Sequence, residues 1–206
     1  MPGQVKTRLC PPLAPEQAAA LYEAMLRDIL SQDPLGPEIE RALWFTPEEA
    51  QSWFASAAGG WRLYPQRGAD LGERMLGLFR THAAQGRDRI VLRGSDSPTL
   101  PAETVVGAFA ALDRADVVLC PDPDGGYNLI GLREAHDALF ELEMSTHTVL
   151  EQTVARARNL GLGVELLPAH HDVDTAADLA RLEPDERTPR TARCLANLRG
   201  SMASLP

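Results

Sequence analysis

The chain has 206 residues, of which 44% are hydrophobic and 24% are charged, and its net charge is -9. This composition excludes a disordered protein, and the length suits one domain that can bury a sizeable core. The acidic balance disfavours non-specific binding to nucleic acid or an anionic membrane, but it does not exclude a nucleotide, because phosphate binding needs only a local cluster of donors.

No apolar run approaches the roughly 20 residues that a membrane helix needs, and no charged-then-apolar leader precedes the body of the chain. We therefore expect a cytoplasmic protein with no membrane or nucleic-acid partner. The cysteines Cys10, Cys120 and Cys194 are far apart and lack C-x-x-C spacing. This pattern disfavours a disulfide framework and a zinc site, so we expect all three to be buried small apolar residues.

The first predicted element is an amphipathic helix over residues 15–31. Its apolar face is formed by Ala18, Leu21, Met25, Leu26 and Ile29. A short apolar run over residues 41–46 then predicts a strand. Thr46, Pro47 and Glu49 have the pattern of a capping box with proline at the first helical position, so a helix should follow this strand.

Strands and helices continue to take turns along the rest of the chain. Further strands are expected over residues 61–66, 88–94, 116–122, 127–133 and 163–169. Further helices are expected over residues 70–86, 101–115 and 146–161, and Thr175 with Asp178 predicts a capping box for a short helix. The alternation predicts an α/β fold with a mostly parallel sheet covered on both faces. The strands at 116–122 and 127–133 are too close for a helical crossover, so we expect an antiparallel neighbour or an irregular excursion there.

The one compositional shift comes near the end of the sequence. A polar stretch with prolines begins at Glu183 and leads into a predicted last helix over residues 190–202. We therefore expect a main domain over residues 1–182 and a C-terminal helical appendage over residues 183–206.

The loop after the strand at 88–94 reads "SDSPTLP" and contains Ser95 and Asp96. Ligands of open parallel sheets bind beyond the carboxyl ends of the strands, where this loop lies. A carboxylate there suits Mg²⁺ or Mn²⁺, which take oxygen ligands and commonly keep only one or two protein carboxylates plus substrate phosphates. The alternative is that Asp96 caps the helix that follows.

The segment "PDPDGGYNLIGL" is a second candidate for a ligand site. Gly125 and Gly126 allow a close approach of a ligand to the backbone. Asp122 and Asp124 are candidate acids, bases or acceptors for sugar hydroxyls, and Tyr127 is a candidate for stacking or hydrogen bonding. The alternative is a plain turn between two strands, since D-G is a strong turn signal.

The third candidate is "HHDVDTAADL", in which Asp172 and Asp174 follow the strand at 163–169. In an extended segment these two carboxylates point to one side, as shared metal coordination requires. His170 and His171 are candidate ligands or proton carriers. No H-E-x-x-H or H-x-x-E-H spacing supports a zinc site, so we interpret the histidines as rim residues.

The opening loop, "PGQVKTRL", holds the only lysine of the chain, whereas the other basic residues are nineteen arginines. Pro2 and Gly3 predict a tight turn. Lys6 and Arg8 are near-neighbour cations able to neutralise a diphosphate, the lysine as a point charge and the arginine as a fork. The alternative is a solvated terminus. Similarly, Asp70 and Arg74 of "GADLGERM" are either ligand contacts or surface charges of a helix.

These motifs in this order over residues 2–182, including "GSDSPTLP" and "DVDTAADL", resemble a family of bacterial glycosyltransferase-like proteins in the nucleotide-diphospho-sugar transferase superfamily. Some of those proteins are transferases associated with radical-SAM proteins and arsenosugar biosynthesis. The resemblance implies a GT-A-like three-layer α/β sandwich, a nucleotide-activated donor, a small-molecule acceptor and Mg²⁺ or Mn²⁺.

The resemblance also assigns roles to residues. It implies phosphate contacts from Gly3, Lys6 and Arg8, metal ligation by Asp96, Asp172 and Asp174, and an acceptor loop from Asp124 to Tyr127. We add Asp70 and Arg74 as nucleotide contacts, Ser95, Gly125 and Gly126 as substrate contacts, and Asp124 as the base that accepts the acceptor's proton.

The sequence departs from this family at its start. Members begin with an apolar strand that leads into the proline-glycine loop, whereas only Met1 precedes Pro2 here. We expect either a true start further upstream or an apolar slot in the sheet with unpaired backbone groups. The first functional hypothesis is a metal-dependent glycosyltransferase using a nucleotide sugar. The alternatives are a nucleotidylyltransferase using a nucleoside triphosphate and a phosphorylated small molecule, and a catalytically inactive nucleotide-binding protein.

Overall fold

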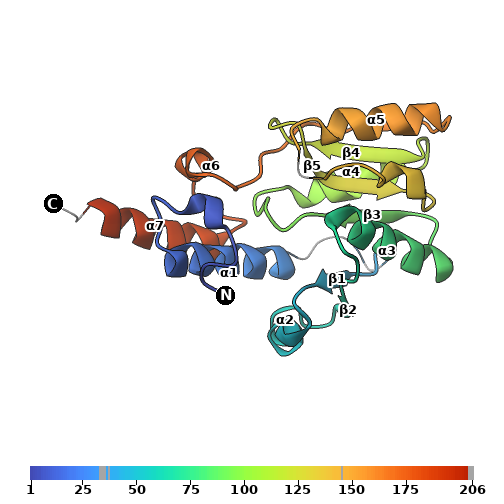
Figure 1. Cartoon of the computed structure of the whole chain (residues 1–206). Coiled ribbons are helices and arrows are strands. Elements are labelled where there is room, and N and C mark those ends of the chain that lie inside the picture. Colours follow the sequence, from blue (N-terminus) through green and yellow to red (C-terminus); the bar gives the residue numbers. More distant parts are fainter. Residues whose placement is uncertain (33–35, 37, 145, 204–206) are drawn as a thin grey trace. The chain divides into compact units, whose positions relative to one another are not determined.

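The computed structural model describes residues 1–32, 36, 38–144 and 146–203. The chain divides into two compact units (Figure 1). The first unit consists of three separate stretches, Met1–Asp33, Ser95–Leu100 and His171–Pro206, and the second unit consists of Pro34–Gly94 and Pro101–His170. Among the described residues, no helix has the length and apolar character needed to cross a membrane.

The order of elements follows the predicted alternation. The α-helices are α1 (Pro15–Ser31), α2 (Gln51–Ala57), α3 (Leu71–Ala84), α4 (Ala102–Ala111), α5 (Val149–Asn159), α6 (Ala176–Arg181) and α7 (Pro189–Ala203). The strands are β1 (Ala42–Phe45), β2 (Arg62–Pro65), β3 (Ile90–Arg93), β4 (Val117–Pro121), β5 (Tyr127–Leu132) and β6 (Val164–Leu166). Short 3₁₀ turns are η1 (Thr7–Leu9), η2 (Glu48–Ala50) and η3 (Asp137–Leu139).

The second unit contains a four-stranded sheet with the order β3-β5-β4-β6. β5 is antiparallel to both β3 and β4, whereas β4 and β6 are parallel. Three of the four strands therefore run in one direction, and β5 runs against them. By pairing, however, only β4 and β6 are parallel neighbours, so the sheet is mixed. The antiparallel neighbour expected where β4 and β5 are joined by a short loop is confirmed.

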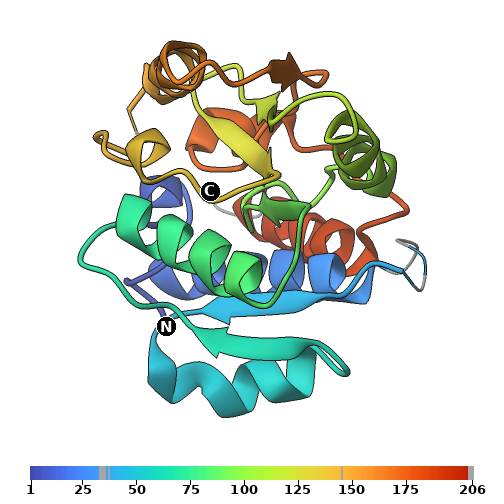
Figure 2. The same ribbon diagram turned by 90° about the vertical axis from the view of Figure 1, so that its right-hand side faces the viewer.

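Helices cover both faces of this sheet, as Figure 2 shows for α4 and α5. Alternate residues of a strand point to opposite faces. Leu119 and Ile130, paired between β4 and β5, pack with Phe79 of α3 and Ala157 of α5 in the main core of the unit. On the other face, α4 packs on β3, β4 and β5. There a Cβ on Gly131 would lie 3.2 Å from the Leu112 side chain that follows α4. The three-layer α/β arrangement is thus confirmed within this unit.

The second unit also holds a separate two-stranded parallel sheet, β1-β2. Trp44 of β1 stacks on Tyr64 of β2, with ring centroids 4.9 Å apart, and packs against the main core. Among the described residues, no strand joins this sheet to the four-stranded one, so β1 and β3 are edge strands. The apolar first strand that the resemblance implies has no counterpart among the described elements.

The first unit is helical. α1 and α7 lie side by side (Figure 1) and enclose a second core with η1 and α6. This core is formed by Leu9, Leu13, Ala18, Leu21, Met25, Val173, Leu179, Leu182, Leu195 and Leu198. The last helix is therefore packed into a unit with α1, and the expected boundary between residues 182 and 183 does not separate two bodies.

A buried carboxylate joins the two long helices of the first unit. Asp28 of α1 is fully buried and accepts hydrogen bonds from the backbone N–H groups of Arg190 and Thr191, at 3.2 and 2.7 Å. The Arg190 guanidinium also donates to it, at 3.2 Å. The helical pattern of α1 predicted an apolar face that included Leu26, but Leu26 is half-buried, and Asp28 and Leu30 take buried positions instead.

Two local predictions are wrong in detail. The capping box of Thr46 and Glu49 does not form, because Pro47 is itself the residue before the first turn, η2, and no side chain caps it. Pro101 likewise precedes α4 as its cap residue and is not its first helical residue. The Thr175–Asp178 capping box of α6, by contrast, is confirmed.

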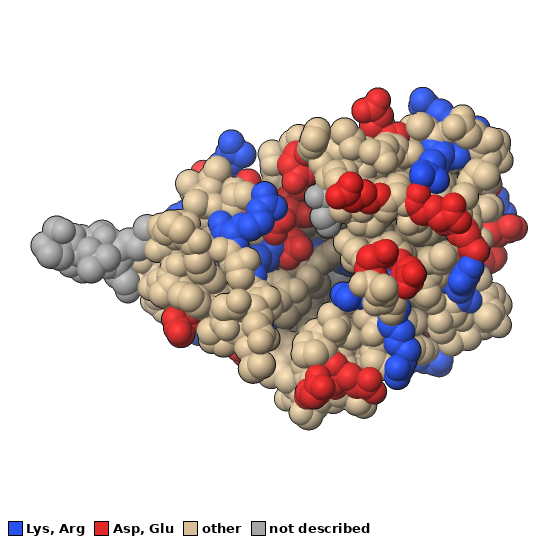
Figure 3. All heavy atoms as spheres, in the orientation of Figure 1, with Lys and Arg blue, Asp and Glu red and all other residues tan. Residues whose placement is uncertain are grey.

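The cysteines are all free, as expected. Cys120 is buried, but Cys10 and Cys194 are only half-buried and pack against the core of the first unit. On the face of the second unit seen in Figure 3, arginine and carboxylate side chains are interspersed. The second unit also has exposed ion pairs such as Arg80–Asp137 and Arg89–Asp113.

Candidate functional site

The opening loop turns sharply and sends its lysine into the first unit. The Gln4 N–H donates to the Met1 carbonyl at 3.1 Å, and Gly3 has φ +73°, which glycine adopts readily. Lys6 also has a left-handed backbone, with φ 49° and ψ 39°. This conformation is uncommon for a residue with a side chain and persists where surrounding contacts fix it. The fully buried Leu9 of η1 anchors the other end of the loop.

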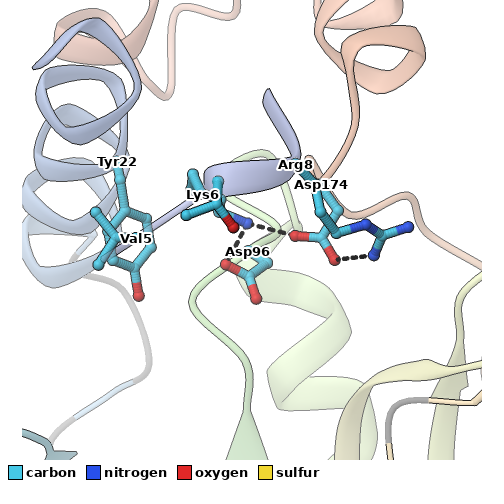
Figure 4. A pocket seen from close by; sticks show the side chains of 7 residues that line it. Val5, Lys6, Arg8, Tyr22, Asp96 and Asp174 are labelled. Carbon is cyan, nitrogen blue, oxygen red and sulfur yellow. Dashed lines mark hydrogen bonds and ion pairs between the residues drawn. The ribbon is translucent and has the colours of Figure 1, made fainter. Parts of the chain in front are cut away.

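The Lys6 ammonium lies among acceptors from two distant segments (Figure 4). It forms an ion pair with Asp96 and lies 2.6 Å from Oδ1 of Asp174. It also donates to the Val173 carbonyl at 2.7 Å, and its side chain is only 5% exposed. Burial lowers the pKa of Lys6, but attraction to Asp96 and Asp174 raises it by more, so the net pKa is raised above 10.5. The ammonium is therefore charged at neutral pH.

Backbone contacts hold the Asp96 loop in place. The Val173 N–H donates to the Asp96 carbonyl at 2.8 Å, and the Leu100 N–H donates to the Ser97 carbonyl at 3.2 Å. Gln32 of the α1 end donates to the Pro98 carbonyl at 3.0 Å. Asp96 does not cap α4, so the capping alternative is wrong. The hydrogen bond to Val173 instead lays this loop beside the segment that carries the other two carboxylates.

The Asp172 and Asp174 side chains have different partners. Asp174 faces Lys6, and its Oδ2 is 3.6 Å from the Arg8 guanidinium. Asp172 accepts a hydrogen bond from the Ser97 hydroxyl, next to Asp96 in the chain. All three predicted metal-binding aspartates therefore lie in one neighbourhood of the first unit, but two of them share the Lys6 ammonium and the third binds a serine.

The α6 capping box fixes the segment that follows. The Asp178 carboxylate accepts from the Thr175 N–H at 2.8 Å and from the Thr175 hydroxyl at 2.7 Å. Burial raises the pKa of Asp178, but these hydrogen bonds lower it by more, so its net pKa is lowered. The capping box thereby fixes the position of Thr175, the residue that follows Asp174.

Tyr22 belongs to the site, although no local sequence pattern predicted it. Its hydroxyl lies 2.8 Å from the Ser95 hydroxyl, and the Lys6 ammonium lies 5.6 Å from the centre of its ring. Burial raises the pKa of Tyr22, so it keeps its proton at neutral pH. In a purely helical pattern Tyr22 is simply the residue beside the buried Leu21, and only the fold shows that it supports Lys6 and Ser95.

These side chains surround a pocket of about 240 Å³ within the first unit. It is lined by Val5, Lys6, Thr7, Arg8, Tyr22, Asp96 and Asp174. Ligand pockets commonly measure about 300–1,000 Å³, so this pocket suits a phosphate-sized group better than a whole nucleotide. Arg8 is 67% exposed at this pocket and is thus available to an anionic ligand.

The donor set bears on the expected Mg²⁺ or Mn²⁺. Within the described ranges, no three histidine, cysteine, aspartate or glutamate side chains lie close enough together to hold a metal ion by themselves. Asp96 and Asp174, however, already reach one common cation, the Lys6 ammonium, with oxygen atoms. Two carboxylates plus ligand phosphates are a usual environment for Mg²⁺, so the residues present fit this ion.

The remaining predicted site residues lie in the second unit. Asp70 caps α3 by accepting from the Glu73 N–H at 2.9 Å, and Arg74 donates to the Gly68 carbonyl at 3.2 Å. Both therefore have structural contacts at the start of a helix. Their expected contacts with a nucleotide stay a prediction.

The "DPDGG" segment forms the turn between β4 and β5, so the turn interpretation is confirmed. Asp124 is exposed and accepts from the Gly126 N–H at 3.0 Å. Gly125 has φ +97°, and an added Cβ would lie 1.8 Å from the His147 carbonyl oxygen. Tyr127 packs against the core, and burial raises its pKa to about 12. Its side chain thus takes a core position and not the predicted ligand-facing one.

A family model for uncharacterised proteins conserved in bacteria, DUF2064, matches residues 31–146. The chain belongs to this family. A solved protein of Desulfovibrio desulfuricans, described as a nucleotide-diphospho-sugar transferase, is 33% identical to this DUF2064 protein. The two superimpose with a TM-score of 0.87 over 98% of this chain and 91% of the other. The predicted fold class is thereby confirmed.

Relatives of this DUF2064 protein include several guanylyltransferases. The 3-phospho-D-glycerate guanylyltransferase of Phenylobacterium zucineum is 32% identical over 202 residues, covering 94% of this chain and 91% of that one. The 2-phospho-L-lactate guanylyltransferase of Methanothermobacter thermautotrophicus is 29% identical over 180 residues, covering 86% and 78%. The phosphoenolpyruvate guanylyltransferase of Sphaerobacter thermophilus is 29% identical over 180 residues, covering 86% of each.

The activities of these relatives favour the nucleotidylyltransferase alternative over the glycosyltransferase hypothesis that the sequence motifs suggested first. Under both hypotheses the protein is a transferase that binds a nucleotide. An association with arsenosugar biosynthesis or radical-SAM proteins finds no support in these relatives and stays a prediction.

Proposed function

We propose that this DUF2064 protein is a metal-dependent nucleotidylyltransferase that transfers a guanylyl group from GTP to the phosphate of a small phosphorylated acid. The observation that carries the proposal is the convergence of Lys6, Asp96 and Asp174 in one pocket, with Arg8 beside it. The guanylyltransferase relatives, which span most of the chain, support the choice of reaction.

The reaction needs little covalent participation from the protein. An oxygen of the acceptor phosphate attacks the α-phosphorus of the nucleotide and forms a new P–O bond. The bond between the α-phosphorus and the bridging oxygen to the β-phosphate breaks, and pyrophosphate leaves with the electron pair. Catalysis of such a step rests on positioning and on stabilising negative charge.

The residues of the pocket suit both tasks. Lys6 supplies a compact charge and Arg8 a planar fork for the phosphate oxygens. Asp96 and Asp174 would hold Mg²⁺ or Mn²⁺, which when bound supplies further positive charge at the phosphates and orients them. Asp172 accepts a hydrogen bond from the Ser97 hydroxyl and thereby helps to hold the loop that carries Asp96.

No general base is required for this reaction. The second pKa of a phosphate monoester is about 6, so the attacking oxygen is already ionised at neutral pH. The predicted role of Asp124 as a base therefore belongs to glycosyl transfer, in which an acceptor hydroxyl must lose a proton. Glycosyl transfer is the second candidate function, and the likeness to the solved nucleotide-diphospho-sugar transferase favours it.

Pyrophosphate release separates the two candidates. Purified protein with Mg²⁺ is incubated with each ribonucleoside triphosphate and with 2-phospho-L-lactate, phosphoenolpyruvate or 3-phospho-D-glycerate. We expect pyrophosphate and a guanylylated acid, identified by mass, only when GTP and one of the acids are both present. Release of a nucleoside diphosphate from nucleotide sugars, with no pyrophosphate from any triphosphate, would overturn the proposal in favour of glycosyl transfer. Nucleotide binding without either product would indicate a non-catalytic protein.

A pair of variants tests the site in the same assay. Asp96→Asn removes a carboxylate from the pocket and should lower the rate by about 100-fold or more, as the loss of one preorganised electrostatic group commonly does. Asp137→Asn removes a carboxylate of the exposed ion pair with Arg80 and should leave the rate unchanged.

A further inference from the structure

The lone lysine of the chain occupies the place where two of the candidate metal-binding carboxylates converge. Its ammonium is paired with Asp96 and Asp174 and hydrogen-bonded to the Val173 carbonyl, and its side chain is almost fully buried. Figure 4 shows its side chain pointing at both carboxylates. In this arrangement the negative charge of the pocket is already balanced from within the chain.

This balance conflicts with a divalent cation on the same carboxylates. If the Lys6 ammonium and a metal ion were both held by the Asp96 and Asp174 carboxylates, the two cations would lie within a few ångströms of each other. Two like charges at about 4 Å repel strongly around a buried side chain, because little water is present to screen them. The carboxylates can therefore serve either Lys6 or the metal ion, but not both in the present geometry.

A lysine side chain can readily move its ammonium away from two carboxylates, because the charge sits at the end of a flexible four-carbon stem. An arginine fork would pair with a carboxylate through two parallel hydrogen bonds and would hold the position more firmly. The pocket beside the ammonium is also lined by Arg8, where phosphates are proposed to bind. A short movement of the Lys6 side chain thus exchanges one anionic partner for another.

We infer that Lys6 is a resident counter-ion that holds Asp96 and Asp174 together in the metal-free protein and leaves them when a divalent cation binds. The released ammonium then turns to the nucleotide phosphates, a second step that rests on the proposed function. Lys6 and the metal ion compete for the same carboxylates, and the nucleotide favours the metal-bound arrangement by giving Lys6 another partner.

The single lysine makes this exchange measurable on the unaltered protein. An N-hydroxysuccinimide ester of acetic acid acylates accessible amines, and mass spectrometry of peptides separates Lys6 from the amino-terminal amine. We expect slow acylation of Lys6 without metal and about tenfold faster acylation with saturating Mg²⁺, as the loss of about 1.4 kcal/mol of protection implies. The amino-terminal amine of the exposed Met1 is the internal control and should react at one rate throughout. Equal Lys6 rates with and without Mg²⁺ would overturn the inference.

Direct metal binding gives the second measurement. Mn²⁺ binding without nucleotide is followed by the loss of the free-ion electron paramagnetic resonance signal. Lys6→Met removes the competing charge at similar length and should bind Mn²⁺ about tenfold more tightly than the wild type. Arg8→Met is the matched control. It removes an exposed cation from the same loop and should raise the affinity by less than about twofold, because solvent screens its charge.

The outcomes separate this inference from the proposed function. Mn²⁺ affinity that is equal or weaker in a folded Lys6→Met protein, as judged by circular dichroism, overturns the inference but leaves guanylyl transfer standing if the wild type makes pyrophosphate. Tighter Mn²⁺ binding in Lys6→Met, together with no transfer by the wild type, supports the inference and overturns the proposed function. Lys6→Arg keeps the charge and should bind Mn²⁺ no more tightly than the wild type.

Discussion

The Lys6 ammonium lies 2.6 Å from the Oδ1 oxygen of Asp174, 168 residues further along the chain. This contact ties the opening loop to the segment before α6, and the Asp96 loop completes the group. A residue that local rules would leave in solvent is thus the centre of a buried polar cluster of the first unit.

Tyr22 supports the site from α1. Tyr22→Phe keeps the ring beside Lys6 but removes the hydroxyl that pairs with Ser95. We expect a loss of about 1 kcal/mol in the free energy of unfolding, the usual contribution of one hydrogen bond. Tyr22→Leu should cost more, because it also removes the aromatic face from the ammonium. Urea denaturation measures both, and equal stability of the wild type and Tyr22→Phe would contradict the role of the hydroxyl.

Asp28 is predicted to be the main polar support of α7. Asp28→Ala leaves the N–H groups of Arg190 and Thr191 without their acceptor and should lower the free energy of unfolding by about 3 kcal/mol. Arg190→Met is the control, since it removes only a half-exposed partner and should cost about 1 kcal/mol. Similar costs for the two variants, measured by denaturant titration, would refute the view that the backbone N–H groups are the important partners.

Gly125 is predicted to tolerate no side chain. Gly125→Ala combines a left-handed backbone with a Cβ placed 1.8 Å from the His147 carbonyl oxygen, so the turn or the start of α5 must move. We expect a loss of about 3–5 kcal/mol. Gly86→Ala is matched in backbone conformation, with φ +80°, but its Cβ meets nothing within 4 Å. It should cost only about 1 kcal/mol, so the difference in melting temperature isolates the steric contact.

His82 should make the stability of the second unit depend on pH. Burial lowers the pKa of His82 below its usual 6.5, and its Nε2 accepts the Trp44 indole N–H at 3.1 Å. Protonation of Nε2 would make it a donor facing the Trp44 indole N–H, which is also a donor, so this hydrogen bond would be lost. The unfolded chain therefore binds a proton at higher pH than the folded chain does. Stability is present above pH 6.5 and is lost as the pH falls through the lower folded pKa.

The measurement is the melting temperature of the wild type and of His82→Gln between pH 7.5 and pH 5. The wild type should lose stability relative to the variant as the pH falls. Trp44→Phe, which keeps the stacking ring but removes the indole N–H, should show an intermediate slope. A wild-type slope equal to that of His82→Gln would rule out His82 as the group responsible.

The order and type of the elements were predictable because they depend on local patterns. The apolar spacing of residues 15–31 predicts α1, and the short link between β4 and β5 forces them to be antiparallel. The ends of elements were less predictable. Thr46 has the right neighbours for a capping box, yet Pro47 takes the position before the turn, and nothing local distinguishes the two.

Most residues of the site could be predicted from the sequence, but the contacts between them could not. Sequence patterns selected Asp96 and Asp174 because charged residues in loops after strands are where α/β proteins place ligands, and they selected Lys6 because it is the only lysine of the chain. They did not show that the three meet, since contacts between residues so far apart in the chain depend on how the stretches of the first unit pack. Asp96 also fitted a helix cap, but Pro101 is the cap residue of α4, no side chain caps that helix, and the Asp96 carboxylate pairs with Lys6.

Tyr22 and Asp28 show the same limit from within one helix. Both sit on α1, where helical periodicity distinguishes apolar from polar positions but does not name the partner of a polar side chain. Tyr22 reaches Ser95 and Asp28 reaches the start of α7. Each partner comes from a different part of the chain, so neither role is readable before the fold is known.

The first unit is assembled from three stretches that lie far apart in the chain, which affects how it folds during synthesis on the ribosome. Lys6 is made 168 residues before Asp174, and at about 5–20 residues per second this interval lasts roughly 10–30 s. The buried Leu195 and Leu198, which complete the core around α1, are synthesised later still. The nascent chain must therefore carry α1 with an uncovered apolar face until α7 has been synthesised. A chain halted anywhere before α7 would be a substrate for chaperones and proteases, not a partial enzyme.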